Sequence, residues 1–354
     1  MEKKEMTRRD VLKVGTAAGL TAVAGSMLGA TKSFAQDKKK AKFKLRMQCH
    51  WPVGVGYYKF GFVAYCDKVR EATDGEVDIT PYAPDTIVPT KDALEATGSG
   101  LLDMNWCWGA YWQGKMPVAS LFCGHTFVWD DFSAMYWNSY CQEAMSIYRA
   151  AYKDHGVHLL VPIGIDGITL WSKKPIQKLA DFKGLKVRST GLPAETLKKA
   201  GMTPVFFPGS ELYQALQSGV CDAAHWGAVY TGYEMKFNEV TKYIVQPDLA
   251  RVSNAEITVN AKLWNKMPKD IQRVLEDCGM AINYEIYARC DYLSKVDMKK
   301  FVSEGGKISR LDNETLKQLQ KFSDQVLDEY AKKDPKYCGP VVKKYREMFD
   351  YVGR

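Results

Sequence analysis

The stretch TPVFFPGSELYQALQSGVCDAAHW, residues 203–226, predicts a strand, a helix and a second strand in succession. Thr203–Phe206 and Cys221–Trp226 are short apolar runs of the kind found in buried strands. Between them, Ser210 is expected to cap a helix that Gly219 ends. Strands that alternate with helices in this way are typical of an open, largely parallel α/β sheet.

The same alternation extends away from this stretch along the chain. Just before it, Gly184–Ser189 is expected to form a turn and a strand, and Pro193–Ala200 a short helix. Nearer the N-terminus, strands and helices are expected in turn at Lys42–Cys49, Tyr57–Thr73, Glu76–Tyr82, Lys91–Ser99 and Leu102–Trp106. Two units of similar build imply an α/β protein with two lobes and mixed, largely parallel sheets.

A long helix is expected after the second unit. The apolar pattern that begins at Pro268 persists to Glu304, which corresponds to a helix about 50 Å long. That length exceeds one lobe, so the helix is expected to bridge both. The chain is expected to cross between lobes at hinges near Ile163–Gly167 and Ser253–Ile257. The expected lobes are residues 42–165 plus 254–293 and residues 166–253 plus 294–354.

Residues 1–35 resemble a twin-arginine export signal. Paired arginines, Arg8 and Arg9, precede a weakly apolar stretch from Val14 to Ala30, and Ser33-Phe34-Ala35 offers small residues for cleavage. The alternative interpretation is a membrane anchor, but the stretch is short and rich in glycine. We therefore expect export with cleavage, and a periplasmic protein.

The overall charge and the cysteines exclude several classes of function. The formal charge is +8, and the leader holds six Lys/Arg against three Asp/Glu, so only a mild +5 remains without it. No long basic tract occurs, so a nucleic-acid partner is not expected. The nine cysteines have wide spacings without a CxxC pair, which does not fit a metal site. Most of them are expected to be small buried apolar residues.

Arg188 ends the strand expected within Gly184–Ser189, and a loop of small residues follows it. Ligands of open α/β sheets bind at the ends of parallel strands. A guanidinium at this place could hold a carboxylate or a sulfonate by two hydrogen bonds. The spacing alone equally allows a surface arginine paired with a nearby Asp or Glu.

The wider block resembles the solute receptors of tripartite ATP-independent periplasmic (TRAP) transporters. Lys183–Arg188 fits their KGLKxR segment, and Pro208–Asp222 fits PxxExYxALQxGxxD. Further matches of the same family occur at Asp74–Val77, Gly100–Met104 and Thr258–Met267, so the resemblance covers nearly all of residues 42–350. It implies a two-lobed periplasmic-binding-protein fold, and it implies that Arg188 forms a salt bridge with a ligand carboxylate.

The segment from Asp222 to Trp226 departs from the branch of this family that binds 2-oxo and hydroxy acids. That branch has DxAEW, in which the Glu helps to hold a cation, and this chain has His225 instead. Two further ligand positions of that branch fall near Asp166-Gly167 and Ala250-Arg251. We therefore expect no bound metal and no cofactor. His225 is either a hydrogen-bonding partner of the ligand or a structural histidine.

Most aromatic residues of such a chain are expected in the core, and the others are expected to wall the pocket. Trp106 and Trp108 project the same way if their strand continues, and Trp51 lies in the first loop. The resemblance places Trp226 and Tyr230 in the stretch that faces the ligand in the family. A pocket with bulky walls suits either a very small anion or a flat aromatic acid. The predicted ligand-binding residues are Arg188, Trp226, His225, Trp106, Trp108, Tyr230, Asp166 and Trp51.

The resemblance implies an extracytoplasmic receptor for a small organic anion, a carboxylate or a sulfonate. Its partners would be the ligand and the membrane subunits of a TRAP permease, and the receptor itself would be a monomer or a homodimer. One alternative is a periplasmic enzyme, although no GxSxG, no HExxH and no phosphate-binding glycine loop occurs. A second alternative is a binding protein that serves a signalling partner.

Overall fold

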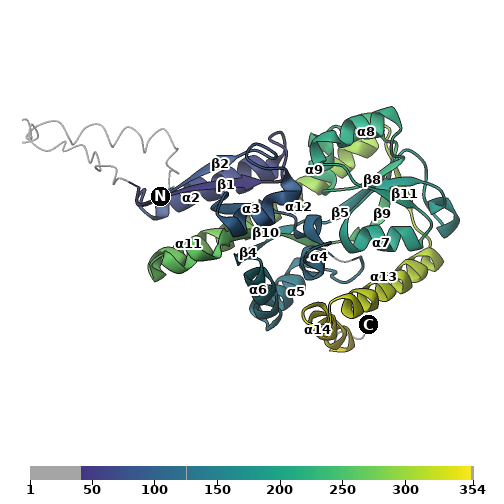
Figure 1. Ribbon diagram of the computed structural model, residues 1–354. Coiled ribbons are helices and arrows are strands. Elements are labelled where there is room, and N and C mark those ends of the chain that lie inside the picture. The colour runs from purple at the N-terminus through teal and green to yellow at the C-terminus, as the bar shows by residue number, and fades with distance from the viewer. Residues whose placement is uncertain (1–40, 125, 352–354) are drawn as a thin grey trace, which may run out of the picture. The chain divides into compact units, whose positions relative to one another are not determined.

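The computed structural model describes residues 41–124 and 126–351, whose strands form two sheets (Figure 1). The first sheet has the strand order β2-β1-β3-β10-β4. The second sheet has the order β11-β9-β5-β8-β6-β7. The strands are β1 Phe43–Cys49, β2 Val77–Tyr82, β3 Met104–Cys107, β4 Val157–Ile165, β5 Ile168–Ser172, β6 Lys186–Arg188, β7 Thr203–Val205, β8 Ala223–His225, β9 Tyr243–Ala250, β10 Ser253–Asn260 and β11 Lys307–Arg310.

Both sheets are mixed. In the first sheet, β1 pairs in parallel with β2 and β3, and β10 runs antiparallel to β3 and β4. In the second sheet, β6 pairs in parallel with β7 and β8, β11 pairs in parallel with β9, and β5 runs antiparallel to β8 and β9. The expected α/β class with mixed sheets is confirmed, with parallel pairings in a narrow majority. The chain passes between the sheets after β4, after β9 and, through α11 and α12, after β10.

Helices connect the strands and cover the sheets. The turns and helices before the long helix are η1 Tyr57–Val63, α2 Ala64–Ala72, η2 Thr90–Asp92, α3 Ala93–Ser99, η3 Gly109–Trp112, α4 Pro117–Cys123, α5 Phe132–Tyr136, η4 Trp137–Cys141, α6 Ala144–Asp154, η5 Leu179–Phe182, α7 Gly191–Lys199, η6 Gly209–Glu211, α8 Leu212–Ser218, α9 Val229–Glu234, α10 Phe237–Val240 and α11 Ala261–Lys266. The last three are α12 Lys269–Ser303, α13 Asn313–Lys333 and α14 Cys338–Tyr351.

Helix α12 is the long helix that the sequence predicts. It has 35 residues and contacts β4 of the first sheet as well as β11 of the second (Figure 1). Gly279 lies where α12 packs on β4, and a Cβ at this glycine would meet Val161 Cγ2 at 2.6 Å. Close packing of one helix on elements of both sheets joins the two lobes along their length.

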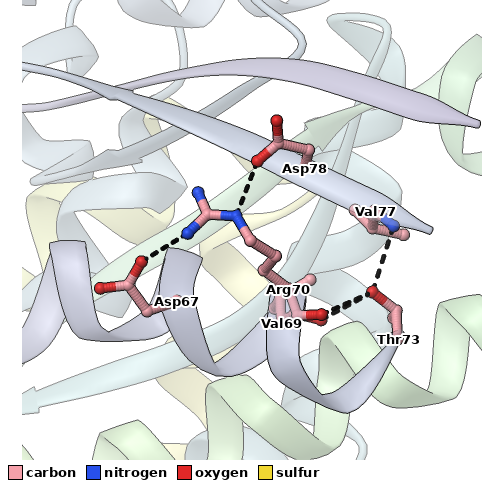
Figure 2. A network of polar contacts seen from close by, with 6 residues as sticks. All are labelled: Asp67, Val69, Arg70, Thr73, Val77 and Asp78. Atoms are coloured by element: carbon pink, nitrogen blue, oxygen red, sulfur yellow. Dashed lines mark hydrogen bonds and ion pairs between the residues drawn. The ribbon is translucent and has the colours of Figure 1, made fainter. Parts of the chain in front are cut away.

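The turn from α2 into β2 shows why the first unit folds as its sequence predicts (Figure 2). Arg70 donates hydrogen bonds to Asp67 on its own helix and to Asp78 on β2, both at 2.8 Å. The hydroxyl of Thr73 donates to the Val69 carbonyl and accepts from the backbone N–H of Val77. Helix end and strand start are therefore joined by side chains that the local sequence supplies.

Two local expectations are revised. Ser210 does not cap α8, because residues 209–211 form a 3₁₀ turn that leads directly into the helix and Glu211 occupies the cap position. The helix expected from Tyr57 begins as a π-helix over Tyr57–Val63 before it continues as α2. The proposed lobe boundaries remain a prediction. Helix α14, which we assigned to lobe II, packs on α4 and α6, which lie between β3 and β4 in the chain.

The cysteines are buried thiols, as expected. Eight of the nine are described as free and buried, and the side chain of Cys141 is outside the described residues. Among residues 41–124 and 126–351, no helix is both long and apolar enough to span a membrane. The predicted export signal, residues 1–35, lies outside the described residues.

Candidate ligand-binding site

Arg188 lies at the carboxyl end of β6, between β8 and β7 in the second sheet. The side chain is only 2% exposed. Its Nε donates to the Phe207 carbonyl at 3.1 Å, and its guanidinium lies over the Phe206 ring, 5.4 Å from the centroid. Nη2 has no hydrogen-bond partner, and no carboxylate of the described residues forms an ion pair with this arginine. The protein thus buries a cation without its counter-ion.

The guanidinium faces a small cavity between elements of the two sheets. The volume open to the centre of a water-sized sphere is about 30 Å³. The lining residues are His50, Trp51, Trp108, Tyr111, Ile165, Ile168, Arg188, Thr190, Pro193, His225, Trp226 and Gly227. No carboxylate occurs among these described residues, so Arg188 is the charged group of the cavity.

Unpartnered polar atoms gather in this cavity. Besides Arg188 Nη2, they are Trp51 Nε1, Trp108 Nε1 and His225 Nε2, all of them buried. Buried polar atoms are nearly always hydrogen-bonded in folded proteins. Four such atoms around one space therefore indicate a place for a polar ligand.

Two neutral histidines border the cavity. Burial, together with a smaller effect of the nearby positive charge of Arg188, lowers the pKa of His50 and of His225 to about 3 in each case. His50 Nδ1 lies 3.3 Å from the carbonyl of Trp106. At neutral pH the cavity therefore carries the single positive charge of Arg188 rather than three.

Aromatic contacts between the two lobes close the cavity. The Trp51 ring stacks on Tyr57 at 4.5 Å and meets Trp226 edge-on at 5.8 Å. Tyr111 meets Phe206 edge-on at 5.5 Å. Beyond Tyr111 lies an outer cavity of about 320 Å³, which is lined by His50, Tyr111 and Phe206 among others. His50 and Tyr111 line both cavities and thus stand between the small inner cavity and the larger outer one.

Five of the eight predicted residues line the cavity together: Arg188, Trp226, His225, Trp108 and Trp51. The prediction drew them from four separate parts of the sequence. Their convergence on one cavity is a finding of the structure, and their contact with a ligand remains a proposal.

Three predicted residues do not line the cavity. Trp106 is fully buried against Phe62 and Gly61, because β3 ends at Cys107 and the strand does not continue through Trp108 as assumed. Tyr230 lies on α9 against Gly56.

Asp166 is the third, and its carboxylate is used within the protein. It accepts hydrogen bonds from the Tyr57 hydroxyl at 3.1 Å and from the Ser294 hydroxyl at 2.5 Å. These bonds join the crossing after β4 to η1 and to α12. Asp166 therefore lies at the first crossing between the sheets, where a hinge is predicted.

Comparison with known proteins decides the family. Residues 57–334 match the family described as bacterial extracellular solute-binding protein, family 7. The chain belongs to this family.

Relatives of this family-7 protein cover most of its length. A monocarboxylate 2-oxoacid-binding periplasmic protein from Nostoc sp. is 26% identical over 332 residues, which is 93% of this chain and 90% of the relative. A TRAP transporter solute-binding protein from Bordetella bronchiseptica, solved with calcium and picolinate in its active site, superposes with a TM-score of 0.81 at 25% identity. That superposition covers 89% of this chain and 94% of the other.

A second solved structure has the same fold. It is a TRAP periplasmic solute-binding protein from Pseudoalteromonas atlantica with bound sodium and pyruvate, with a TM-score of 0.80 at 24% identity. It covers 88% of this chain and 95% of its own. Both of these solved structures contain a bound cation as well as an organic acid. Within the described part of this chain, no group of three or more His, Cys, Asp or Glu side chains is arranged to hold a metal ion.

The sequence did not identify several lining residues of this family-7 site. His50 directly precedes the predicted Trp51, and Tyr111 lies in the aromatic cluster after β3. Ile165, Ile168 and Pro193 are ordinary apolar residues, and their role depends on how the lobes face each other. A signal for His50 was present, since a loop that presents Trp51 to a cavity also places its neighbour there.

Proposed function

We propose that the protein is an extracytoplasmic solute receptor that binds a small organic anion in the cavity at Arg188 and delivers it to a TRAP-type membrane permease. The observation that carries this proposal is the buried, unpaired guanidinium. A cation removed from water without a counter-ion costs several kcal/mol. A carboxylate or sulfonate in the cavity would supply the missing charge.

Contacts across the cavity support a closing mechanism. Trp51 and Trp226 meet from opposite lobes, and the backbone N–H of Gly56 donates to the Glu234 carboxylate of α9 at 2.8 Å. An anion held by Arg188 on one lobe and by Trp51 and Trp108 on the other would favour this closed state by its extra contacts. The closed, loaded form would then dock on the permease.

The size of the cavity supports a small ligand. A space of about 30 Å³ compares with the roughly 10–15 Å³ that one water molecule needs on the same measure. A monocarboxylate or sulfonate with few non-hydrogen atoms fits such a space better than a flat aromatic acid. The relative that binds 2-oxoacids agrees with this size class.

We further propose that the receptor works in the periplasm after export by the twin-arginine route. Two relatives are periplasmic binding proteins, and Arg8-Arg9 with the following apolar stretch supplies the route. Relatives of known structure are receptors, so we propose no catalytic role. Turnover of the bound ligand by the purified protein would contradict this.

The test is calorimetry on Arg188→Ala with a ligand found by a thermal-shift screen of small carboxylates and sulfonates. Loss of one charge-assisted hydrogen-bonding group of this kind costs about 1.5–3 kcal/mol, so affinity should fall roughly 10- to 150-fold. Arg70→Ala, which removes a surface arginine bonded to Asp67 and Asp78, is the matched control and should bind normally. Wild-type affinity in Arg188→Ala would exclude this arginine as the anchor.

A further inference from the structure

Tyr111 lines three cavities of the described structure. It borders the inner cavity at Arg188, the outer cavity of about 320 Å³ and a third cavity of about 250 Å³ beside α7. His50 borders the first and the second of these, Thr190 the first and the third, and Phe206 the second and the third. Among the described residues, Tyr111 is the one that all three linings share.

The local fold holds Tyr111 at this meeting point. Its 3₁₀ turn, η3, follows β3, and the backbone N–H of Gly109 in the same turn donates to Cys123 Sγ of α4 at 2.9 Å. Gly191 of α7 lies so close to the turn that an added Cβ would meet the Cβ of Ala110 at 3.0 Å. The turn is therefore packed against both α4 and α7.

The half-buried ring of Tyr111 is also packed against other rings. It meets Phe206 edge-on with 5.5 Å between the ring centroids, and it meets His50 edge-on at 5.9 Å. Phe206 in turn has the Arg188 guanidinium over its ring, 5.4 Å from the centroid. The Tyr111 ring thus belongs to a packed group that reaches the buried cation.

The two indole walls of the inner cavity are backed by packed protein. Trp51 stacks on Tyr57 at 4.5 Å. Behind Trp108, an added Cβ at Gly124 would meet the indole at 3.2 Å. Behind Tyr111, by contrast, lie the outer and the third cavity. Removal of the Tyr111 ring would therefore join an inner cavity of about 30 Å³ to an outer one of about 320 Å³.

Resting on the proposed function, we infer that the Tyr111 ring sets the upper size limit of the ligand, so that the receptor selects monocarboxylates with the shortest chains. The carboxylate lies at Arg188, and a chain longer than a methyl or ethyl group meets the Tyr111 ring. Without this ring, a longer alkyl chain continues into the outer cavity.

The lining of the outer cavity suits an alkyl chain. Its charged residues are Asp85 and Lys91, and the carboxylate of Asp85 already accepts from the backbone N–H and the hydroxyl of Thr90 at 2.6 and 2.9 Å. Apolar side chains make up much of the rest: Pro52, Pro84, Pro89, Phe206 and Pro208. The third cavity is more polar, with Gln113, Ser189 and Glu195 in its lining. A long chain should therefore enter the outer cavity.

The test is calorimetry on the wild type, Tyr111→Ala and Tyr111→Phe with two series of acids: acetate, propionate, butyrate and hexanoate, and pyruvate with 2-oxohexanoate. The wild type should bind the shortest acids at least about tenfold more tightly than the six-carbon acids, because a fixed ring makes overpacking unfavourable. In Tyr111→Ala this order should reverse, since each methylene buried in an apolar cavity improves affinity roughly fourfold.

Tyr111→Phe is the matched control, because it removes the hydroxyl and keeps the ring. Its order of affinities should be that of the wild type. If circular dichroism shows that Tyr111→Ala does not fold, Tyr111→Leu takes its place and should shift the order in the same direction.

A wild type that binds hexanoate as tightly as propionate would overturn the inference, while the proposed function would stand. An unchanged order in the folded variant without the ring, or a reversed order in Tyr111→Phe, would do the same. Failure of every carboxylate and sulfonate to bind the wild type and the variants would overturn both.

Discussion

At the scale of single residues, the site combines side chains that are held in place with donor atoms that have no internal acceptor, namely Arg188 Nη2, Trp51 Nε1 and Trp108 Nε1. Trp51 is held by its stack on Tyr57, and Arg188 is held through Nε by the Phe207 carbonyl. Neither side chain needs to reorganise when an anion arrives, so little of the binding free energy is lost in ordering them. The same rigidity limits which ligands can meet all the donors at once.

Trp108→Phe tests the donor role directly. The exchange keeps an aromatic wall but removes Nε1–H, so ligand affinity should fall about 2- to 12-fold, the effect of a hydrogen bond of 0.5–1.5 kcal/mol. Trp106→Phe is the matched control two residues away, since its buried indole nitrogen is also unpartnered but does not face the cavity. Calorimetry should show normal affinity for Trp106→Phe even if urea unfolding shows lower stability. Equal losses of affinity in both variants would contradict the donor role.

The sequence could identify those site residues whose side chains are charged or can titrate. Arg188 follows from its motif, and His225 stands out because it replaces an expected Glu. Trp106 could not be separated from Trp108, because the point at which β3 ends depends on its pairing with β1 and β10. Asp166 was expected near the ligand, but the hydroxyls of Tyr57 and Ser294 reach it from elements that the sequence places far away.

At the scale of elements, the loop from β1 to η1 packs tightly against α9. Gly56 approaches α9 so closely that an added Cβ would meet Tyr230 Oη at 2.6 Å. Its N–H also donates to Glu234 on the same helix. A glycine at this position lets a loop of the first lobe pack tightly against a helix of the second.

Gly56→Ala should therefore weaken ligand binding without harming the fold of either lobe. Overpacking costs about 1–3 kcal/mol, and here the cost falls on the closed state, so the dissociation constant should rise roughly tenfold. Gly54→Ala is the matched control, because an added Cβ there meets nothing within 4 Å. Calorimetry of both variants with the same ligand makes the comparison. Equal affinities in the two variants would show that this contact does not limit closure.

Most elements could be predicted because their signals are local. Helices α2 and α12 could be predicted from their own residues, because each has an apolar face. Each helix also ends close to a glycine with a positive φ, Gly75 or Gly305. The π-helical start at Tyr57–Val63 could not be predicted in this way. It occurs where the rings of Trp51, Tyr57 and Phe62 and the indole beside Gly61 must fit together.

At the scale of the whole molecule, three buried carboxyl groups couple stability to pH. Burial raises the pKa of Asp166 to about 7, that of Glu256 to about 7 and that of Asp248 to about 6. Each group binds a proton more tightly in the folded chain than in the unfolded one. Their contribution to the stability of the folded state is present at acidic pH and is lost as the pH rises from about 4 toward 7, whereas His50 and His225, whose pKa values are lowered to about 3, contribute the opposite slope below pH 6.5.

The variant Asp166→Asn removes one of these three titrating groups and leaves the other two in place. The free energy of unfolding of the wild type, relative to that of the variant, should fall between pH 5 and pH 7 by up to about 1.4 kcal/mol per pH unit, because only the wild type carries the Asp166 proton. The amide of the variant does not titrate and can still bond Tyr57 and Ser294. Urea unfolding at pH 5, 6 and 7 measures both slopes. Identical slopes would show that Asp166 is ionised in the folded state at all three values.

The lobe boundaries and the oligomeric state are properties of the whole molecule that stay predictions. Helix α14 packs on α4 and α6, whereas α13 packs on α7 of the second unit. The C-terminal helices thus contact both halves, which sequence periodicity could not reveal. Sedimentation of the purified protein would decide between a monomer and a homodimer.

The rate at which a reagent modifies each buried thiol can report how often the surrounding lobe opens. Cys66 lies in α2 beneath the first sheet, and Cys221 lies just before β8 of the second. An alkylating reagent reaches a buried sulfur only when the surrounding structure opens. The labelling rate at Cys66 then reports opening of one lobe, and the rate at Cys221 reports opening of the other. A solute that slows both rates together has coupled the two lobes, and the chain carries these reporters without any engineered label.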